Sequence, residues 1–398
     1  MLKKGLIYIL LNYMIQFLNI LFNLLLMKYL NSYQLGSLAL AKTWQQFVDY
    51  SHLGARFSLD RYIPVAKDEE KKYLVATVLF TTFIGALFIL LVSIIFNKAD
   101  IVVSILTASG VFIAVGNIVK AYYRATNNLT EMLKLVFYNQ LVPLLISIAI
   151  YFYTLDFHLY LISLLSSYLF FALILFYRER ELFHFIKYER LKHVIKEIAV
   201  PSSLLFINSL IVFLYLVMDR FFIDYSNGRE ELGHYSIILF TFSALMIIPA
   251  SIAELLFVKI IKQSCESGKR FFWRETFITL GVTIVGVIVA NFCMDYFVTR
   301  FTNYSFLSQQ MHMASFAVIP FALTAIYYHV MNGLDLRKQI ILVNFLVFLI
   351  LLLCYLIPLL LNEKFSLNYY LYAKILTGWF IFSGYIFFIF LSKKTNVD

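Results

Sequence analysis

Apolar stretches, each about as long as a membrane-crossing helix, follow one another through the sequence with short polar breaks between them. A helix needs roughly 20 predominantly apolar residues to cross the hydrocarbon core of a bilayer. Twelve stretches can be distinguished: 6–27, 35–56, 73–96, 101–121, 134–153, 157–177, 197–218, 234–258, 276–298, 310–332, 339–361 and 366–391. They occupy most of the chain, which leaves no room for a large soluble domain. The sequence therefore predicts an all-α polytopic membrane protein with about twelve transmembrane helices.

The composition excludes the common soluble classes. Hydrophobic residues make up 62% of the chain and charged residues only 14%, whereas soluble domains are roughly half apolar and a quarter charged. The net charge of +10 does not indicate nucleic-acid binding, because the basic residues form short clusters between apolar stretches. The sequence contains no closely spaced Cys/His ligand set, nucleotide-binding loop or hydrolase motif. We expect no cofactor, no metal, no nucleic-acid partner and no enzymatic activity.

The distribution of Lys and Arg predicts the orientation of the chain in the membrane. Cytoplasmic loops of membrane proteins carry an excess of both residues. The N-terminus, the even-numbered loops and the C-terminus hold 25 of the 33 Lys and Arg residues, and the odd-numbered loops hold six. Both termini are therefore expected to face the cytoplasm.

Short matches within the sequence indicate an internal repeat. Leu35-Gly36 corresponds to Leu232-Gly233 at an offset of 197 residues, and the segment 122–129 resembles 327–334 at an offset of 205. Two repeats of six spans share one orientation and are related by a pseudo-two-fold axis along the membrane normal. Chance similarity between apolar segments is the alternative. The repeat predicts two six-helix lobes with a substrate site between them.

A basic stretch after the sixth span marks the boundary between the lobes. From Arg178 to Lys196, apolar residues recur at roughly helical spacing among positive charges, which is typical of an amphipathic helix on the inner membrane surface. A linker role is favoured over a specific lipid-binding role, and Pro201 is expected to end the helix. The predicted domains are an N-terminal lobe, 1–177, a cytoplasmic linker helix, 178–200, and a C-terminal lobe, 201–398.

Polar side chains inside the first two spans lie on single helical faces. The first span carries the amides Asn12, Gln16, Asn19 and Asn23, and the second carries Lys42, Gln45, Asp49, His52 and Arg56. Successive members are three or four residues apart, so each set shares one face of a helix. Hydrogen bonds between helices suffice to explain the amides. For Lys42, Asp49 and His52 we favour a hydrated cavity, because charged groups within a membrane are costly without dedicated partners.

Two of these residues are candidates for ion coupling. Asp49 and His52 are three residues apart and can form a hydrogen bond within one helix, which would hold the imidazole near the pH at which it titrates. Glu254, in the eighth span, is a third candidate, with snorkelling to the nearby inner surface as the alternative.

Cations within or beside other spans suit an anionic substrate. Lys374 lies two turns into the twelfth span, where it could also snorkel outward, and Arg124 lies at the inner end of the fourth, where it could set topology. Asp219-Arg220, at the outer end of the seventh span, is interpreted as an interfacial ion pair or a substrate contact. The candidate residues for the substrate cavity are Lys42, Gln45, Arg56, Arg124, Lys374, Asn12, Gln16 and Asn19.

Several short motifs, in order and at similar spacing, resemble those of the bacterial O-antigen and polysaccharide flippases. These proteins form the polysaccharide transporter branch of the superfamily that also contains the multidrug and toxic compound extrusion exporters. The motifs are Lys28–Gly36, Asp49–Gly54 and Arg61–Pro64 in the first half, and Met218–Ile223, Glu231–Ser236 and Ile248–Pro249 in the second. The similarity in hydropathy extends over essentially the whole chain.

The resemblance implies a two-lobed bundle of twelve helices in the bacterial inner membrane. It would move an undecaprenyl-pyrophosphate-linked oligosaccharide, such as an O-antigen repeat unit of lipopolysaccharide, from the inner to the outer leaflet by alternating access. A central, often cationic, cavity would hold the sugar and pyrophosphate, and a polysaccharide polymerase and a chain-length regulator are possible partners.

Two other functions are considered. A multidrug exporter of the same superfamily also accommodates an acidic residue in the N-terminal lobe. A membrane polysaccharide polymerase or glycosyltransferase is disfavoured, because such enzymes commonly need a sizeable outside loop, and the longest odd-numbered loop runs only from about Asp219 to Gly233.

Overall fold

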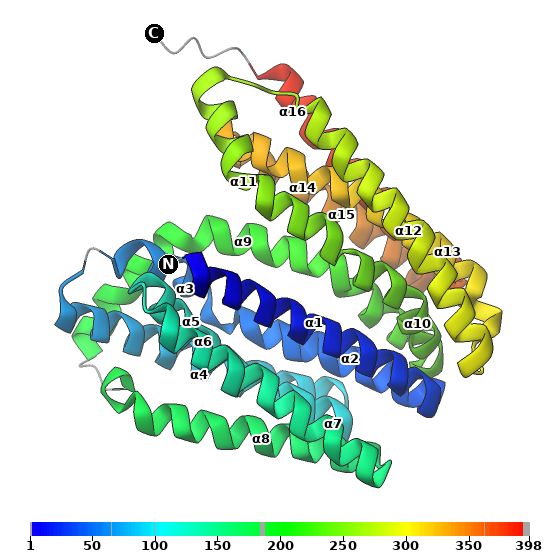
Figure 1. The fold of residues 1–398 in the computed structure, drawn as a ribbon, viewed down its shortest axis with the longest axis horizontal. Helices are drawn as coiled ribbons and strands as arrows, with labels where there is room; N and C mark the ends of the chain where they lie inside the picture. Colours follow the sequence, from blue (N-terminus) through cyan, green and yellow to red (C-terminus); the bar gives the residue numbers. More distant parts are fainter. Residues whose placement is uncertain (1, 65, 99, 184–187, 362, 393–398) are drawn as a thin grey trace. The chain divides into compact units, whose positions relative to one another are not determined.

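The computed structural model describes residues 2–64, 66–98, 100–183, 188–361 and 363–392. Every regular element within these ranges is a helix, as the apolar stretches predict (Figure 1). The chain forms two compact units. Unit 1 comprises Met1–Leu25 and Ser37–Leu210, and unit 2 comprises Leu26–Gly36 and Ile211–Asp398.

Unit 1 is built from the helices of the first half of the chain. They are α1 (Leu2–Tyr29), α2 (Ser32–Val48), η1 (Asp49–His52), α3 (Ala55–Tyr62), α4 (Asp68–Phe96), α5 (Ile101–Ala125), α6 (Leu129–Val136), η2 (Phe137–Leu141), α7 (Val142–Thr154), α8 (Phe157–Arg178) and η3 (Arg180–Phe183). The helix α5 packs against both α4 and α8, and α7 packs against α8. Apolar residues of α3, α4, α5 and α6 form the largest part of its core.

Unit 2 is built around α14, which packs against α11, α12 and α16. Its helices are α9 (Tyr188–Ser226, from Ile211 on), α10 (Arg229–Leu245), α11 (Ile247–Ser267), α12 (Trp273–Phe301), η4 (Ser305–Leu307), α13 (Ser308–Phe316), α14 (Val318–Gly333), α15 (Arg337–Leu361) and α16 (Leu367–Leu391). The segment Ser305–Gly333 is two-thirds buried, the largest share among the candidate spans of the described residues.

The predicted end of the linker helix at Pro201 is wrong. The helix α9 runs without interruption from Tyr188 to Ser226, and the division between the units lies within it, between Leu210 and Ile211. Proline is tolerated inside membrane helices, because neighbouring groups satisfy the carbonyl that loses its partner. The side chains of 183–200 lie outside the described part of the chain, so the amphipathic character of this segment stays a prediction.

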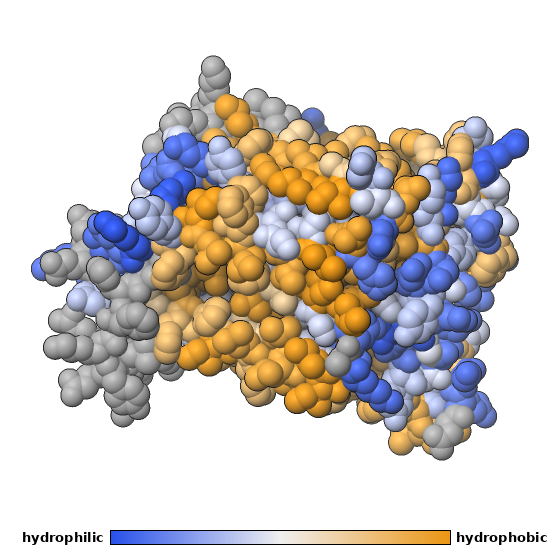
Figure 2. Space-filling view, turned by 90° about the horizontal axis from the view of Figure 1, so that it is seen from below, coloured by the Kyte–Doolittle hydropathy of each residue, from blue (hydrophilic) through white to orange (hydrophobic). Residues whose placement is uncertain are grey.

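The twelve predicted spans correspond closely to the helices. Ten helical segments of the described residues are long and apolar enough to cross a membrane, and Tyr13–Tyr29 of α1 is a shorter apolar helix. The remaining predicted span, 35–56, is broken. Figure 2 shows that apolar residues form a band on the face drawn there, and that hydrophilic residues gather at its ends. The chain is therefore an all-α, multi-pass membrane protein.

The second predicted span breaks at the polar face from which the candidate site was inferred. The helix α2 ends at Val48, η1 follows, and α3 begins at Ala55. Between η1 and α3, Leu53 and Gly54 have φ values of 47° and 89°, in the left-handed region that ends a helix. A single helical face from Lys42 to Arg56 is therefore wrong, because Arg56 lies beyond the turn.

The two helices that the second sequence match relates, α5 and α14, have similar C-terminal ends. The helices α5 and α14 end in the same cap, in which Asn127 and Asp335 have left-handed φ values of 58° and 55°. In both caps the next residue donates its N–H to the carbonyl five residues earlier. The caps are 208 residues apart, whereas the sequence match used an offset of 205.

Candidate functional site

The Asp49 carboxylate lies at the break after α2, where two side chains hold it. Arg56, on α3, places Nη1 2.9 Å from Oδ2, and the Asn117 amide, on α5, donates to Oδ1 over 2.7 Å. The side chains of Asp49 and Arg56 are 36% and 24% exposed. The ion pair is thus held by α5 on one side and remains partly exposed.

Asn117 was not among the residues singled out in the sequence. Its position within a largely apolar span is the signal that could have identified it, because polar side chains within a membrane usually have a partner. It contacts Asp49 across a separation of 68 residues, which helical spacing cannot reveal.

His52 is buried beside the same break. Its Nδ1 accepts the Gly54 backbone N–H at 3.0 Å, so this nitrogen carries no proton in the structure. The imidazole is 3% exposed and meets the Phe206 ring edge-on, with centroids 6.0 Å apart. The histidine thus fixes the turn that brings Arg56 to Asp49.

Lys42 and Gln45 lie on α2, about two turns and one turn before the break, respectively. The Lys42 ammonium donates to Asn23 Oδ1 on α1 over 2.5 Å, and the Gln45 amide donates to the Ser109 hydroxyl on α5 over 2.7 Å. Both side chains are partly exposed. Together with Asp49 of η1 they form a polar side of this segment, which lies within unit 1.

The remaining candidates of unit 1 do not converge on this side. Gln16 and Asn19 are exposed on α1, and the Asn19 amide donates to the Ile15 carbonyl of its own helix at 3.0 Å. Arg124 is exposed in the last turn of α5. The side chains of Asn12 and, in unit 2, Glu254 lie outside the described part of the structure.

Arg178 forms a second polar cluster of unit 1, beside a pocket of about 450 Å³. Its guanidinium pairs with Glu131 at 3.1 Å and with Glu179 at 2.9 Å. It also donates to the Tyr123 hydroxyl, which in turn donates to Glu179. These contacts join the ends of α5, α6 and α8, and they leave the guanidinium with internal partners.

In unit 2, Lys374 forms a buried ion pair with Asp219. The Lys374 ammonium lies 2.5 Å from Asp219 Oδ2 and donates to the Leu216 carbonyl over 2.7 Å. The Tyr235 hydroxyl donates to the same carboxylate oxygen at 2.8 Å. The two charged side chains are 1% and 0% exposed. Lys374 is thus neutralised inside unit 2 and presents no charge to a substrate in this structure.

This pairing differs from the sequence interpretation of Asp219. The carboxylate was expected at an interface beside Arg220, or in contact with substrate. Arg220 instead contributes its backbone N–H, which donates to Asp219 Oδ1 at 2.9 Å. The ion pair links α9 to α16 across 155 residues of sequence.

In unit 2, Gly36 of α2 lies against the backbone of α10, and Gly233 of α10 lies against the backbone of α2. A Cβ added to Gly36 would lie 1.9 Å from the Arg229 carbonyl oxygen, and one added to Gly233 would lie 1.9 Å from the Ser32 carbonyl oxygen. Ser32 and Arg229 are separated by 197 residues, as the glycines are. The first turns of α2 and α10 therefore cross with their backbones in contact, in an arrangement that is symmetric between the repeats. We call this contact the glycine crossing.

Within the described residues, no group of three His, Cys, Asp or Glu side chains could hold a metal ion. The Asp49–Arg56 pair is partly exposed, whereas the Lys374–Asp219 pair is buried.

Comparison of the whole chain with solved structures assigns the fold. The lipid II flippase MurJ, in an inward closed conformation, superposes with a TM-score of 0.70 and 15% sequence identity, over 96% of this chain and 87% of that one. The eukaryotic MATE transporter AtDTX14 superposes with a TM-score of 0.55 and 14% identity, over 96% and 92%. The chain shares the fold of these transporters.

At these identities the likeness concerns the fold. No family model matches the sequence, and no curated protein matches it either. The fold expected from the resemblance to the exporter superfamily is confirmed. The narrower resemblance, to polysaccharide flippases, is carried by the short motifs alone.

Proposed function

We propose that the protein is a flippase that moves an undecaprenyl-pyrophosphate-linked oligosaccharide from the inner to the outer leaflet by alternating access. The observation that carries the proposal is the MurJ-like fold, which extends over 96% of the chain. MurJ is a flippase for lipid II, and the sequence motifs resemble flippases for polysaccharide repeat units. The proposal places the protein in a bacterial inner membrane with both termini in the cytoplasm, where polymerase and chain-length regulator would use its product.

The Asp49–Arg56 pair supplies a way to couple an ion gradient to an anionic substrate. When Asp49 takes up a proton, it loses the charge that holds Arg56 at 2.9 Å. The guanidinium is then available to pair with pyrophosphate oxygens, for which its planar donor geometry is suited. Proton binding and substrate binding thereby favour each other, so the pair moves a proton in the same direction as the substrate, and flipping is fastest when the pH is lower on the side from which the substrate starts.

A multidrug exporter is the second candidate, because the fold also matches a MATE transporter. A cationic drug would be favoured by ionised Asp49, whereas a pyrophosphate-linked substrate is favoured by Arg56 after proton uptake. The two functions therefore predict opposite effects of pH on substrate affinity. The polymerase or glycosyltransferase alternative has no formed extramembrane site in the described residues to support it.

Asp49→Asn is expected to abolish the dependence of translocation on the pH gradient. Asparagine cannot take up the proton, and Arg56 no longer has a carboxylate partner. A charge-assisted hydrogen bond contributes about 1.5–3 kcal/mol, so a roughly 10-fold or greater loss of gradient-driven rate is expected. Translocation of lipid-linked oligosaccharide into proteoliposomes with an imposed pH gradient measures it. His52→Ala should reduce the same dependence by loosening the turn.

The matched control is Glu70→Gln, which removes an exposed carboxylate from α4 of the same unit and should leave the gradient dependence unchanged. The coupling hypothesis is wrong if both Asp49→Asn and His52→Ala retain normal gradient dependence.

Deletion of the gene tests the substrate. Lipid-linked oligosaccharide is expected to accumulate on the inner leaflet, and the surface polysaccharide that contains the same sugars should be lost. Mass spectrometry of extracted lipids identifies the accumulated glycan. A deletion strain with normal surface polysaccharide and increased drug sensitivity would instead support the exporter.

A further inference from the structure

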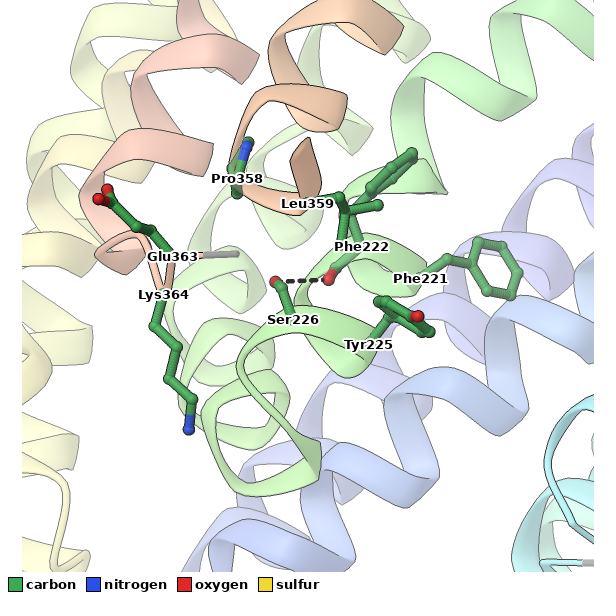
Figure 3. Close-up of a pocket in the computed structure, with 8 residues that line it drawn as sticks. All are labelled: Phe221, Phe222, Tyr225, Ser226, Pro358, Leu359, Glu363 and Lys364. Atoms are coloured by element: carbon green, nitrogen blue, oxygen red, sulfur yellow. Dashed lines mark hydrogen bonds between the residues drawn. The ribbon is translucent and has the colours of Figure 1, made fainter. Parts of the chain in front are cut away.

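A pocket of about 510 Å³ lies in unit 2 at the end where α9 and α15 both terminate (Figure 3). This volume is in the range of small-molecule sites, roughly 300–1,000 Å³. The α9 side of the pocket consists of aromatic residues, and the facing side consists of the end of α15 and the loop before α16. The residues used below are Phe221, Phe222, Tyr225, Pro358, Glu363 and Lys364.

The position of the pocket along its helices corresponds to the membrane–water boundary. The candidate spans Ser202–Ser226 and Arg337–Leu361 both end at this point. The side chain of Tyr225 is 82% exposed. Aromatic side chains concentrate at this depth of the bilayer, where their rings contact the upper acyl region and their polar atoms reach the headgroups. An occupant of the pocket is therefore exposed to lipid on one side and to water on the other.

The walls of the pocket are fixed by contacts within unit 2. The ring of Phe222 packs against Tyr355 at a centroid distance of 5.6 Å. The loop is tied to both helices, because the Glu363 N–H donates to the Pro358 carbonyl at 3.1 Å and the Asn227 amide donates to the Phe365 carbonyl at 2.8 Å. These bonds hold Lys364 on both sides, so the pocket is largely formed before a ligand arrives.

Two opposite charges supply the polarity of the pocket. Glu363 and Lys364 are adjacent and exposed, and neither forms an ion pair with another described residue. Figure 3 shows that their side chains leave the loop in opposite directions, so the carboxylate and the ammonium are separated along one wall. The Ser226 hydroxyl donates to the Phe222 carbonyl at 2.7 Å and lies 3.0 Å from the Tyr370 hydroxyl, so it already has partners within unit 2.

We propose that this pocket binds the headgroup of a zwitterionic glycerophospholipid that ends in a primary ammonium. Its phosphate pairs with Lys364, its ammonium donates to the Glu363 carboxylate, and its glycerol and upper acyl carbons lie against Phe221, Tyr225 and Pro358. A quaternary ammonium headgroup has no N–H to donate, and an anionic headgroup without an amine leaves Glu363 unused. The inference does not depend on the proposed transport function.

Native mass spectrometry of the purified protein tests the site with an equimolar mixture of phosphatidylethanolamine, phosphatidylcholine and phosphatidylglycerol. The protein is expected to retain phosphatidylethanolamine about fivefold over phosphatidylcholine, since one exposed charged contact is worth about this factor. Glu363→Gln should reduce that ratio to about one. Lys364→Gln should weaken retention of all three lipids, and Tyr225→Ser should do so without changing their order.

Matched controls lie elsewhere in unit 2. Glu266→Gln and Lys338→Gln remove an exposed carboxylate and an exposed ammonium, near the end of α11 and the start of α15. Both should preserve the wild-type lipid ratios. An unchanged ratio in Glu363→Gln would overturn the proposal, as would displacement of the bound lipid by a neutral oligosaccharide, which would assign the pocket to sugar.

Discussion

Asp219→Asn and Lys374→Met are each expected to lower the free energy of unfolding by about 3–5 kcal/mol, because either change leaves one charge buried without its counter-charge. The two side chains are 0% and 1% exposed, and their charged atoms are 2.5 Å apart. The remaining partner cannot reach water without displacing α9, α10 or α16. Equilibrium unfolding in mixed micelles measures the loss.

The double variant Asp219→Asn with Lys374→Met separates the pair interaction from general damage. With both charges removed, no ion is left buried, so most of the stability should return. Recovery in the double variant is the sign of a coupled pair. If the effects of the two single substitutions simply add, Lys374 and Asp219 do not act as a pair.

An exposed ion pair of the same chemistry is available as a control. Lys262 and Glu266 lie on α11, 4.0 Å apart, with side chains 68% and 65% exposed. Water screens such pairs, and their long side chains lose entropy when they associate. Lys262→Met is therefore expected to leave the unfolding transition unchanged.

The second large effect is expected at the glycine crossing. Gly36→Val or Gly233→Val would place a Cβ 1.9 Å from a backbone carbonyl oxygen of the facing helix. Cβ atoms in proteins essentially never come closer than 3.0 Å to another heavy atom in such contacts. Overpacking typically costs about 1–3 kcal/mol. We expect the upper end of that range, because the obstacle is main chain and cannot rotate away. Unfolding in mixed micelles again provides the measurement.

Gly281 is a control that separates the steric collision at the glycine crossing from the low helix propensity of glycine. It lies inside α12 with open space around its Cα, so an added Cβ meets nothing within 4 Å. Gly281→Ala should raise stability by about 0.5–1 kcal/mol, because alanine has the better helix propensity. Wild-type stability in Gly36→Val would mean that the first turns of α2 and α10 do not cross with their backbones in contact.

The spans could be predicted because bilayer crossing requires a simple property, about 20 apolar residues in succession. The break after Val48 could not be located from that property. Its turn depends on a left-handed Leu53, a conformation that leucine does not favour, followed by Gly54. In the sequence, only Gly54 is a residue type typical of turns. The three- and four-residue spacing of polar residues therefore predicted a helix that extends to Arg56.

The candidate residues were predictable as polar groups at costly positions, but their partners were not. Depth and helical face identified Asp49 and Lys374 as residues that need an explanation. The explanations come from Asn117, 68 residues from Asp49, and from Asp219, 155 residues from Lys374. Such contacts depend on which helices pack against each other. The spacing of residues along the sequence does not indicate which helices become neighbours.

The glycine crossing limits how the two halves of this sequence can change over evolutionary time. Positions far apart in a sequence ordinarily accumulate substitutions independently. Here a side chain gained at Gly36 or Gly233 collides with the main chain of the facing helix. No substitution in the facing helix relieves the collision, because every residue type has the same carbonyl group. Substitution is therefore restricted at both glycines at once, even if the surrounding positions change.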